Sequence, residues 1–109
     1  MNVEFHSEAV LELVEAGLYY ETQVPGLGRQ FEIEIQNAVE RILQFPKIGH
    51  PLEADLRKWG LDRFPYSLIY SQSEDLIYIL VVANQHRRPG YWKSRQVRYV
   101  LAAPAKMRQ

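Results

Sequence analysis

Basic and aromatic side chains are concentrated in one stretch near the C-terminal end of the sequence. The run HRRPGYW, residues 86–92, directly follows an apolar segment. Arginine binds a phosphate group through two parallel hydrogen bonds, and tyrosine and tryptophan rings stack on nucleic-acid bases. The imidazole of His86 could transfer protons near neutral pH. These residue types predict either a surface that contacts RNA or a metal-free site that cleaves a phosphodiester bond.

Arg57, Lys58 and Arg63 lie on or beside the strands expected to neighbour this stretch in a sheet. The ends of neighbouring antiparallel strands bring such residues into one patch. The alternative is that these charges are solvated strand ends. We expect this of Arg63, whereas both interpretations stand for Arg87. The candidate catalytic residues are Arg87, Tyr91, Arg57, Lys58 and His86.

Other chemistries have little support in the sequence. The absence of cysteine excludes disulfides, a thiol nucleophile and cysteine-based zinc sites. His6, His50 and His86 lack a second histidine or carboxylate at ligand spacing, so each is expected to be an isolated surface or loop residue. Glu12 and Glu15 fall on the polar face of a predicted helix, where solvation is expected rather than acid–base catalysis. No metal and no cofactor is therefore expected.

Length and charge are those of one small globular domain. The chain has 109 residues, of which 47% are hydrophobic and 24% charged, and its formal net charge is zero. That balance argues against a generally basic nucleic-acid coat protein. It conceals a polarity, because residues 1–45 carry minus six, residues 46–85 minus one and residues 86–109 plus seven. No signal peptide or membrane span is visible, and a cytoplasmic location is expected.

The first part of the chain is predicted to form a strand and two helices. Alternation over residues 2–6 predicts the strand, and Ser7 is the expected N-cap of the first helix. The expected buried stripe of this helix is Val10, Leu13, Val14, Gly17 and Leu18, with Gly17 allowing close approach of another backbone. The pattern breaks at residues 24–28, and the second stripe is Leu27, Phe31, Ile35, Ala38, Val39 and Ile42, which Pro46 ends. So short a connection predicts an antiparallel helical hairpin.

The hairpin needs a sheet on which to bury its apolar faces. Strands are predicted over residues 54–59, 66–72 and 76–83, the last being apolar throughout and therefore central. A short polar connection joins the last two strands as a β-hairpin. Trp59 and Trp92 are expected to be partly buried, and residues 92–103 are expected to form a short C-terminal helix. The predicted fold is a single α+β domain, residues 1–109, with an N-terminal strand, an antiparallel two-helix hairpin packed on an antiparallel β-sheet and a short C-terminal helix.

Several motifs occur in series along the chain. They are Ser7-Glu8-Ala9 after the opening strand, Tyr19-Tyr20-Glu21, Pro25-Gly26-Leu27-Gly28 leading to Phe31, Pro46 and Gly49, Leu56-Arg57, Phe64-Pro65-Tyr66-Ser67-Leu68-Ile69-Tyr70, and residues 86–92 with Arg95. In this order they resemble the RelE/ParE superfamily of toxins from bacterial type II toxin–antitoxin modules, and the ParE-type branch more closely. The resemblance covers residues 2–95 and implies the same fold as the pattern does.

The resemblance implies two activities on one fold. One branch cleaves ribosome-bound mRNA with basic residues and a tyrosine instead of a metal; the other inhibits DNA gyrase by a non-enzymatic contact. In the nuclease branch, the resemblance implies an arginine after the last strand and a C-terminal tyrosine, which correspond to Arg87 and Tyr91. It also implies a pair of lysines on an earlier strand, whose approximate counterparts are Arg57 and Lys58. Ser67 replaces an expected arginine, which removes a stabiliser of phosphate charge.

The resemblance also implies a partner, a small antitoxin with a flexible segment that folds on binding. Such segments are often acidic, so the basic end of the chain should attract one. The residues expected to bind the partner are Arg87, Arg88, Tyr91, Trp92 and Arg95. We expect the toxin of such a module, acting as a ParE-like gyrase inhibitor without catalysis. The alternatives are a ribosome-dependent, metal-independent mRNA endonuclease and a non-toxic homologue that binds an antitoxin.

Overall fold

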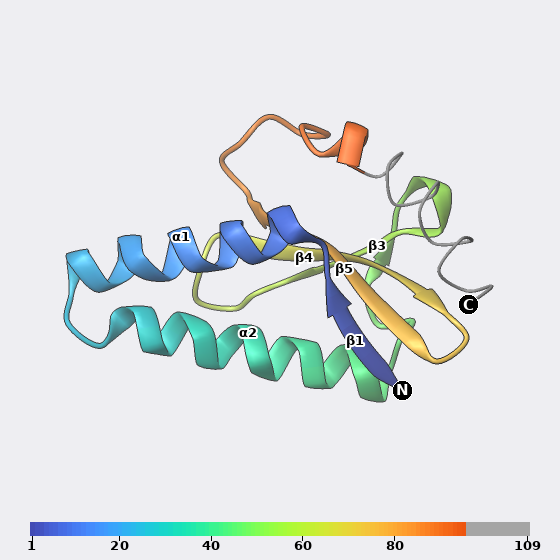
Figure 1. Cartoon of the computed structure of the whole chain (residues 1–109), viewed down its shortest axis with the longest axis horizontal. Helices are drawn as coiled ribbons and strands as arrows, with labels where there is room; N and C mark the ends of the chain where they lie inside the picture. Colours follow the sequence, from blue (N-terminus) through green and yellow to red (C-terminus); the bar gives the residue numbers. More distant parts are fainter. Residues whose placement is uncertain (96–109) are drawn as a thin grey trace.

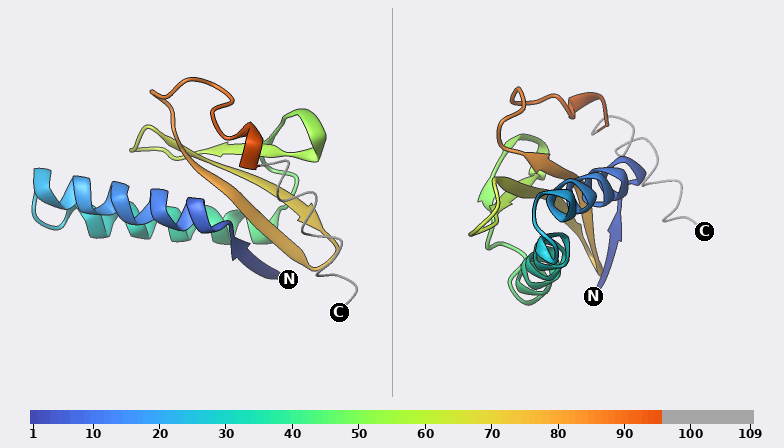
Figure 2. Two further views of the ribbon diagram at one scale, coloured as in Figure 1. Left: turned by 45° about the horizontal axis from the view of Figure 1, so that its top comes forward. Right: turned by 90° about the vertical axis from the view of Figure 1, so that its left-hand side faces the viewer.

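A five-stranded sheet carries a helical hairpin on one face in the computed structural model of the protein, which describes residues 1–95 (Figure 1). The elements in chain order are β1 (Asn2–Phe5), α1 (Ser7–Gln23), α2 (Leu27–Gln44), β2 (His50–Pro51), a 3₁₀ turn (Glu53–Asp55), β3 (Arg57–Gly60), β4 (Tyr66–Ser73) and β5 (Leu76–Asn84). The helices cover one face, and the chain after β5 passes over the other (Figure 2). The predicted α+β arrangement is confirmed.

The sheet is mixed rather than wholly antiparallel. Its strand order is β1-β5-β4-β3-β2, and β1 pairs parallel with β5, with Val3 opposite Ile77. The other pairings are antiparallel, including the predicted hairpin of β4 and β5. No turn constrains the direction of β1 relative to β5, because both helices and three strands lie between them in the chain. Strand β5 lies inside the sheet between β1 and β4, as its apolar pattern predicted, and β4 is the middle strand.

The second helix packs as its pattern predicts. Phe31, Ile35 and Ile42 are buried against the sheet residues Leu68 and Tyr70. Near the turn of the hairpin, the rings of Tyr20 and Phe31 contact each other, and both also contact Phe64 and Tyr66, at the start of β4. Burying such large side chains is the main source of stability in a domain of this size.

The first helix is rotated relative to the prediction. Val10, Val14 and Leu18 were expected in the core, but between 43% and 63% of each is exposed to solvent. The residues that α1 buries are the small Ala9 and Ala16. Leu13, also predicted in this stripe, is partly buried against the core. Periodicity alone places the large apolar side chains inward, whereas here the alanines allow close packing and Val10, Val14 and Leu18 face outward.

Side chains bind free backbone amides at the N-termini of both helices. The N-cap of α1 is His6 rather than Ser7, since His6 Nδ1 accepts a hydrogen bond from the Glu8 amide at 3.0 Å. His6 is also buried, contrary to the expected surface position. At the start of α2, the Glu21 carboxylate accepts hydrogen bonds from the Gly26 and Gly28 amides. A side chain of α1 therefore satisfies free amides at the N-terminus of α2.

The close approach of another backbone expected at Gly17 is present, but the glycine whose missing side chain permits it is Gly28. A Cβ atom on Gly28 would lie 2.5 Å from the Gly17 carbonyl oxygen, whereas a Cβ on Gly17 would meet nothing closer than 4.0 Å. The two helices therefore touch backbone to backbone at the Gly28 position.

The predicted strand over residues 54–59 begins later, at Arg57. Residues 53–55 form the 3₁₀ turn, in which Ala54 and Asp55 have φ values of 57° and 63°. Left-handed backbone cannot continue a strand, so β3 starts only after it. At the other end of the described chain, residues 93–95 are helical. The rest of the C-terminal helix predicted to residue 103 lies outside the described residues.

Candidate functional site

The face of the sheet opposite the helices carries a basic groove. We use this name for the cavity of about 190 Å³ between β3, β4, β5 and the segment that follows β5. Its polar and aromatic lining includes Lys58, Ser67, Arg87, Arg88 and Tyr91. Trp92 closes its floor by packing on Ile69, Leu80, Val81 and Ala83, so this tryptophan is a buried core residue.

Arg87 and Tyr91 are in direct contact at the groove. The Arg87 guanidinium carbon lies 4.0 Å from the centre of the Tyr91 ring, which is a cation–π contact. The Arg87 residue is otherwise exposed, so its charge faces solvent from a fixed support. This geometry suits the recognition of an anionic group.

The Tyr91 hydroxyl is bound by a carboxylate of α1. It donates a hydrogen bond to Glu12 Oε2 at 2.9 Å. Burial, together with the negative charge of Glu12, raises the pKa of Tyr91 to about 12. The phenol therefore keeps its proton at neutral pH and is not poised to act as a general base.

Position 67 contributes no charge to the groove. Ser67 is almost fully buried, and its Oγ accepts a hydrogen bond from Gln85 Nε2 at 3.1 Å. The same amide donates to the Tyr66 carbonyl at 3.3 Å. A small hydroxyl here fixes the start of the segment after β5, where an arginine would have supplied a cation.

Arg57 and His86 lie away from the groove. Successive residues of β3 face opposite sides of the sheet, so Lys58 faces the groove and Arg57 the helical side. Arg57 Nη1 donates to the carbonyls of Lys47 and Gly49. His86 is exposed and does not line the groove. The structure thus brings together Lys58, Arg87 and Tyr91 from the candidate catalytic set.

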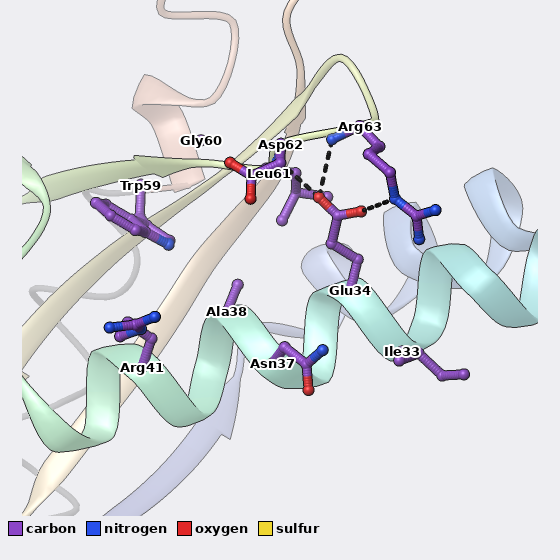
Figure 3. A pocket seen from close by; sticks show the side chains of 10 residues that line it. All are labelled: Ile33, Glu34, Asn37, Ala38, Arg41, Trp59, Gly60, Leu61, Asp62 and Arg63. Atoms are coloured by element: carbon purple, nitrogen blue, oxygen red, sulfur yellow. Dashed lines mark hydrogen bonds and ion pairs between the residues drawn. The ribbon is translucent and has the colours of Figure 1, made fainter.

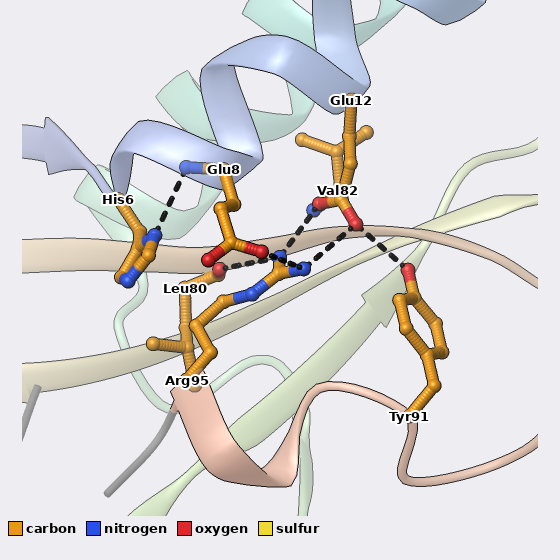
Figure 4. A network of polar contacts seen from close by, with 7 residues as sticks. All are labelled: His6, Glu8, Glu12, Leu80, Val82, Tyr91 and Arg95. Atoms are coloured by element: carbon orange, nitrogen blue, oxygen red, sulfur yellow. Dashed lines mark hydrogen bonds and ion pairs between the residues drawn. The ribbon is translucent and has the colours of Figure 1, made fainter. Parts of the chain in front are cut away.

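Four of the five residues expected to bind a partner line the groove, and Arg95 does not. Its side chain is 7% exposed and forms ion pairs with Glu12 at 2.9 Å and Glu8 at 3.2 Å (Figure 4). Glu12 is therefore an internal ion-pair partner rather than the solvated residue that the helix pattern predicted. Arg95 and Glu12 are 83 positions apart in the sequence. The only feature of the sequence that could have indicated this ion pair is the i, i+4 spacing of Glu8 and Glu12, which puts two carboxylates on one side of α1.

A second cavity, of about 320 Å³, lies between α2 and the loop after β3 (Figure 3). Glu34 closes one end, accepting hydrogen bonds from the Asp62 and Arg63 amides and pairing with the Arg63 side chain at 3.2 Å. Its carboxylate is thus used to anchor the loop. Arg63, expected to be solvated, keeps 65% of its side chain exposed while making this pair.

Large apolar side chains stand out on the solvent side of α1. We call this surface the α1 apolar face and define it by Val10, Leu11, Val14, Leu18 and Tyr19, which are 43% to 63% exposed. Contiguous exposed apolar side chains of this kind mark interaction surfaces in soluble proteins. The chain thus has two distinct candidate surfaces, one apolar and one basic.

Comparison with known proteins decides the family. Residues 3–89 match the family described as "ParE toxin of type II toxin-antitoxin system, parDE". The chain belongs to the ParE toxin family. Its fold is similar to that of a solved chain from a "Chromosomal ParDE TA system from P. aeruginosa", with 20% sequence identity, a TM-score of 0.58, and 77% of this chain and 95% of that chain covered. No curated protein sequence matches.

Two further properties of this ParE-family chain bear on its chemistry. Residues 1–95 contain no group of three histidine, aspartate or glutamate side chains arranged to hold a metal ion. Within the same residues, neither helix combines the length and the apolar character needed to cross a bilayer.

Proposed function

We propose that this ParE-family toxin inhibits DNA gyrase by a non-enzymatic contact and is neutralised by a cognate antitoxin. The observation that carries the non-enzymatic part is the state of Tyr91 in the basic groove. Its hydroxyl is bonded to Glu12, and its raised pKa keeps the proton in place. A groove whose one phenol is held neutral by a neighbouring carboxylate serves binding better than proton transfer.

The surrounding charges support the same proposal. Metal-free cleavage of a phosphodiester needs cations close to the phosphate to stabilise the developing charge. Ser67 supplies none, and the Arg57 guanidinium is bonded to loop carbonyls on the other side of the sheet. The groove retains Lys58, Arg87 and Arg88, which are sufficient for attracting an acidic surface.

Arg87 is the residue that we expect to carry the contact with the target. Its guanidinium is exposed, and the Tyr91 ring beneath it restricts its side chain. A pre-positioned cation loses less conformational entropy on binding than a free one, and arginine is common among the residues that dominate interfaces.

The antitoxin is proposed to use the α1 apolar face. A flexible segment that folds on binding as an amphipathic helix would bury its apolar side on Leu11, Val14 and Leu18, which share one side of α1. Acidic residues of the same segment would be attracted to Arg87 and Arg88. A small open reading frame beside the gene should encode this partner.

Two assays with the purified toxin test the activity. Gyrase supercoiling should be inhibited, while a translation reaction with mapping of mRNA ends should show no new cleavage. Arg87→Ala should lose most of the inhibition, and Arg63→Ala, which removes an exposed arginine outside the groove, should keep it. Ribosome-dependent cleavage of transcripts with supercoiling untouched would overturn the proposal.

A second candidate function rests on one observation. Lys58, Arg87 and Tyr91 do line a single groove, which is the arrangement expected of a ribosome-dependent mRNA endonuclease. Cleavage in the translation assay that Arg87→Ala abolishes would favour it. If neither assay responds while the antitoxin still binds, the chain is a non-toxic homologue.

A further inference from the structure

One carboxylate, that of Glu12, joins three segments that are far apart in the chain (Figure 4). Its Oε1 accepts hydrogen bonds from the Val82 amide at 3.0 Å and from Arg95 Nη1 at 2.9 Å. Its Oε2 accepts from the Tyr91 hydroxyl at 2.9 Å and from Arg95 Nη2 at 3.2 Å. Helix α1, strand β5 and the segment after β5 therefore meet at a single side chain.

An irregularity of β5 creates the place where Glu12 binds. The register with β4 shifts so that Ile69 opposes Val81 while Tyr70 opposes Ile79, which leaves Leu80 without a partner on β4. Such a bulge turns backbone groups away from the neighbouring strand. Strand β1 ends at Phe5, opposite Ile79, so it does not extend to Val82. The Val82 amide donates to Glu12 instead, and the Leu80 carbonyl accepts from Arg95 Nη1 at 3.3 Å.

Burial makes these contacts costly to break. The side chains of Arg95 and Glu12 are 7% and 16% exposed, and Arg95 Nε has no hydrogen-bond partner among the described residues. The guanidinium therefore depends on Glu12, with help from Glu8 and the Leu80 carbonyl. Removing one member of a buried ion pair leaves an uncompensated charge, which favours release of the segment that carries it.

The anchored segment is the one that bears Arg87. Glu12 holds Tyr91 by its hydroxyl, and Arg87 rests on the face of the same ring. Trp92, next to Tyr91, packs into the apolar cluster on the open side of the sheet. The position of the Arg87 guanidinium is thus linked to α1 through Tyr91.

We infer that Glu12 is a positioning residue that anchors residues 86–95 to α1 and β5 and thereby fixes Arg87 for contact with the target. The inference rests on the proposed role of Arg87 and adds a residue from a helix that does not line the groove. Glu12, an acidic residue, thus contributes to the function of the basic groove.

Glu15 provides a matched control for the test. It lies on the same helix, carries the same charge and is exposed. Glu12→Gln removes the charge and one acceptor with little change in volume, and Glu15→Gln makes the same chemical change at a solvated position. A general effect of charge or helix propensity would affect both variants alike.

Trp92 reports on the anchor without reference to any target. In a Trp59→Phe background it is the single tryptophan, since the chain contains two. We expect Glu12→Gln to raise the acrylamide quenching of Trp92 at least about twofold below the unfolding transition, as for a local opening, and Glu15→Gln to leave it unchanged. Far-UV circular dichroism, with the helical signal retained, separates local release from unfolding. Unchanged quenching in Glu12→Gln would overturn the inference.

The link to Arg87 is tested by combining substitutions and measuring the concentration that gives half-maximal growth arrest or gyrase inhibition. Glu12→Gln should raise that concentration about tenfold, which is the effect of losing one hydrogen bond to a charged group. In an Arg87→Ala background the same substitution should raise the concentration hardly any further, because the two residues act through one contact. If Glu12→Gln weakens inhibition as much in the Arg87→Ala background as it does in the parent, Glu12 acts independently of Arg87. That result would overturn the positioning role. If the parent inhibits neither growth nor gyrase, the proposed function fails, and Trp92 quenching then decides by itself whether Glu12 anchors the segment.

Discussion

At the scale of single residues, surroundings rather than residue type decide what Tyr91 and Glu12 do. A phenol and a carboxylate are both capable of proton transfer, and in water their pKa values lie about six units apart. Here the carboxylate accepts hydrogen bonds from Tyr91, Val82 and Arg95, and the phenol is held protonated beside it. Both groups are therefore used to maintain geometry, and the exposed cation Arg87 is left to make contacts.

The raised pKa of Tyr91 predicts a specific loss of stability in alkaline solution. Unfolded Tyr91 releases its proton near pH 10, whereas the folded protein holds it until about pH 12. Stability from this group is therefore full below pH 10 and is lost as the pH rises toward 12, by up to about 2 kcal/mol. In Tyr91→Phe this part is absent, so the free energy of unfolding should fall less between pH 9 and pH 11.5, measured by denaturant titration. Burial also raises the pKa of Tyr20, Tyr66 and Tyr70, and these three residues are present in both the parent and Tyr91→Phe. If the free energy of unfolding falls equally in the parent and in Tyr91→Phe, the loss does not come from Tyr91, and the prediction is wrong.

At the scale of elements, α2, β4 and β5 follow their sequence patterns, and α1 does not. In α2 the largest apolar residues recur at helical spacing and face the sheet, so periodicity alone locates the core. In α1 the fully buried residues are alanines, with Leu13 and Tyr20 partly buried beside them. The other large apolar residues, which form the α1 apolar face, are exposed to solvent. A pattern that counts apolar residues cannot distinguish a core from a surface meant for a partner.

The contact between the helices predicts that two glycines of the hairpin differ sharply in tolerance. Gly28→Ala would place its Cβ 2.5 Å from the Gly17 carbonyl oxygen, a backbone atom that cannot move without shifting α1. We expect a loss of about 2–3 kcal/mol in the free energy of unfolding, the cost of overpacking. Gly17→Ala meets no atom closer than 4.0 Å and should gain about 0.5–1 kcal/mol from helix propensity. Urea denaturation of both variants checks this, and equal effects of the two substitutions would contradict the packing described.

Part of the site was predictable from sequence, for reasons that these elements make clear. Arg87 and Tyr91 are four residues apart and follow β5, and Lys58 lies on β3, which is separated from β5 by β4 alone. Composition and the expected sheet were therefore enough to expect them together. Assigning Arg57 to the other face required the register of β3 against β4, which a short strand does not reveal. The pairing of Glu12 with Arg95 depends on the bulge at Leu80 and spans most of the chain.

At the scale of the whole molecule, part of the charge polarity is satisfied internally. The acidic helix α1 contacts the basic end of the chain through the pairs of Arg95 with Glu8 and Glu12. Lys93 likewise pairs with Glu53 at 3.4 Å. Arg87 and Arg88 remain exposed in the basic groove. The basic groove lies on the open side of the sheet, and the α1 apolar face lies on the helical layer. Each surface can therefore bind a different partner.

This separation predicts variants that lose one interaction and keep the other. Leu11→Gln combined with Leu18→Gln changes two side chains that are about 60% exposed, so folding should be little affected. Because the apolar contact is lost, affinity for the product of the adjacent reading frame should fall at least about tenfold, while growth inhibition persists. Arg87→Ala should show the opposite, with weak inhibition and antitoxin binding through α1 largely retained. Calorimetric titration with the antitoxin and growth assays with and without its co-expression distinguish the two variants. Loss of toxicity in the double leucine variant with antitoxin affinity intact would mean that the α1 apolar face contacts the target instead.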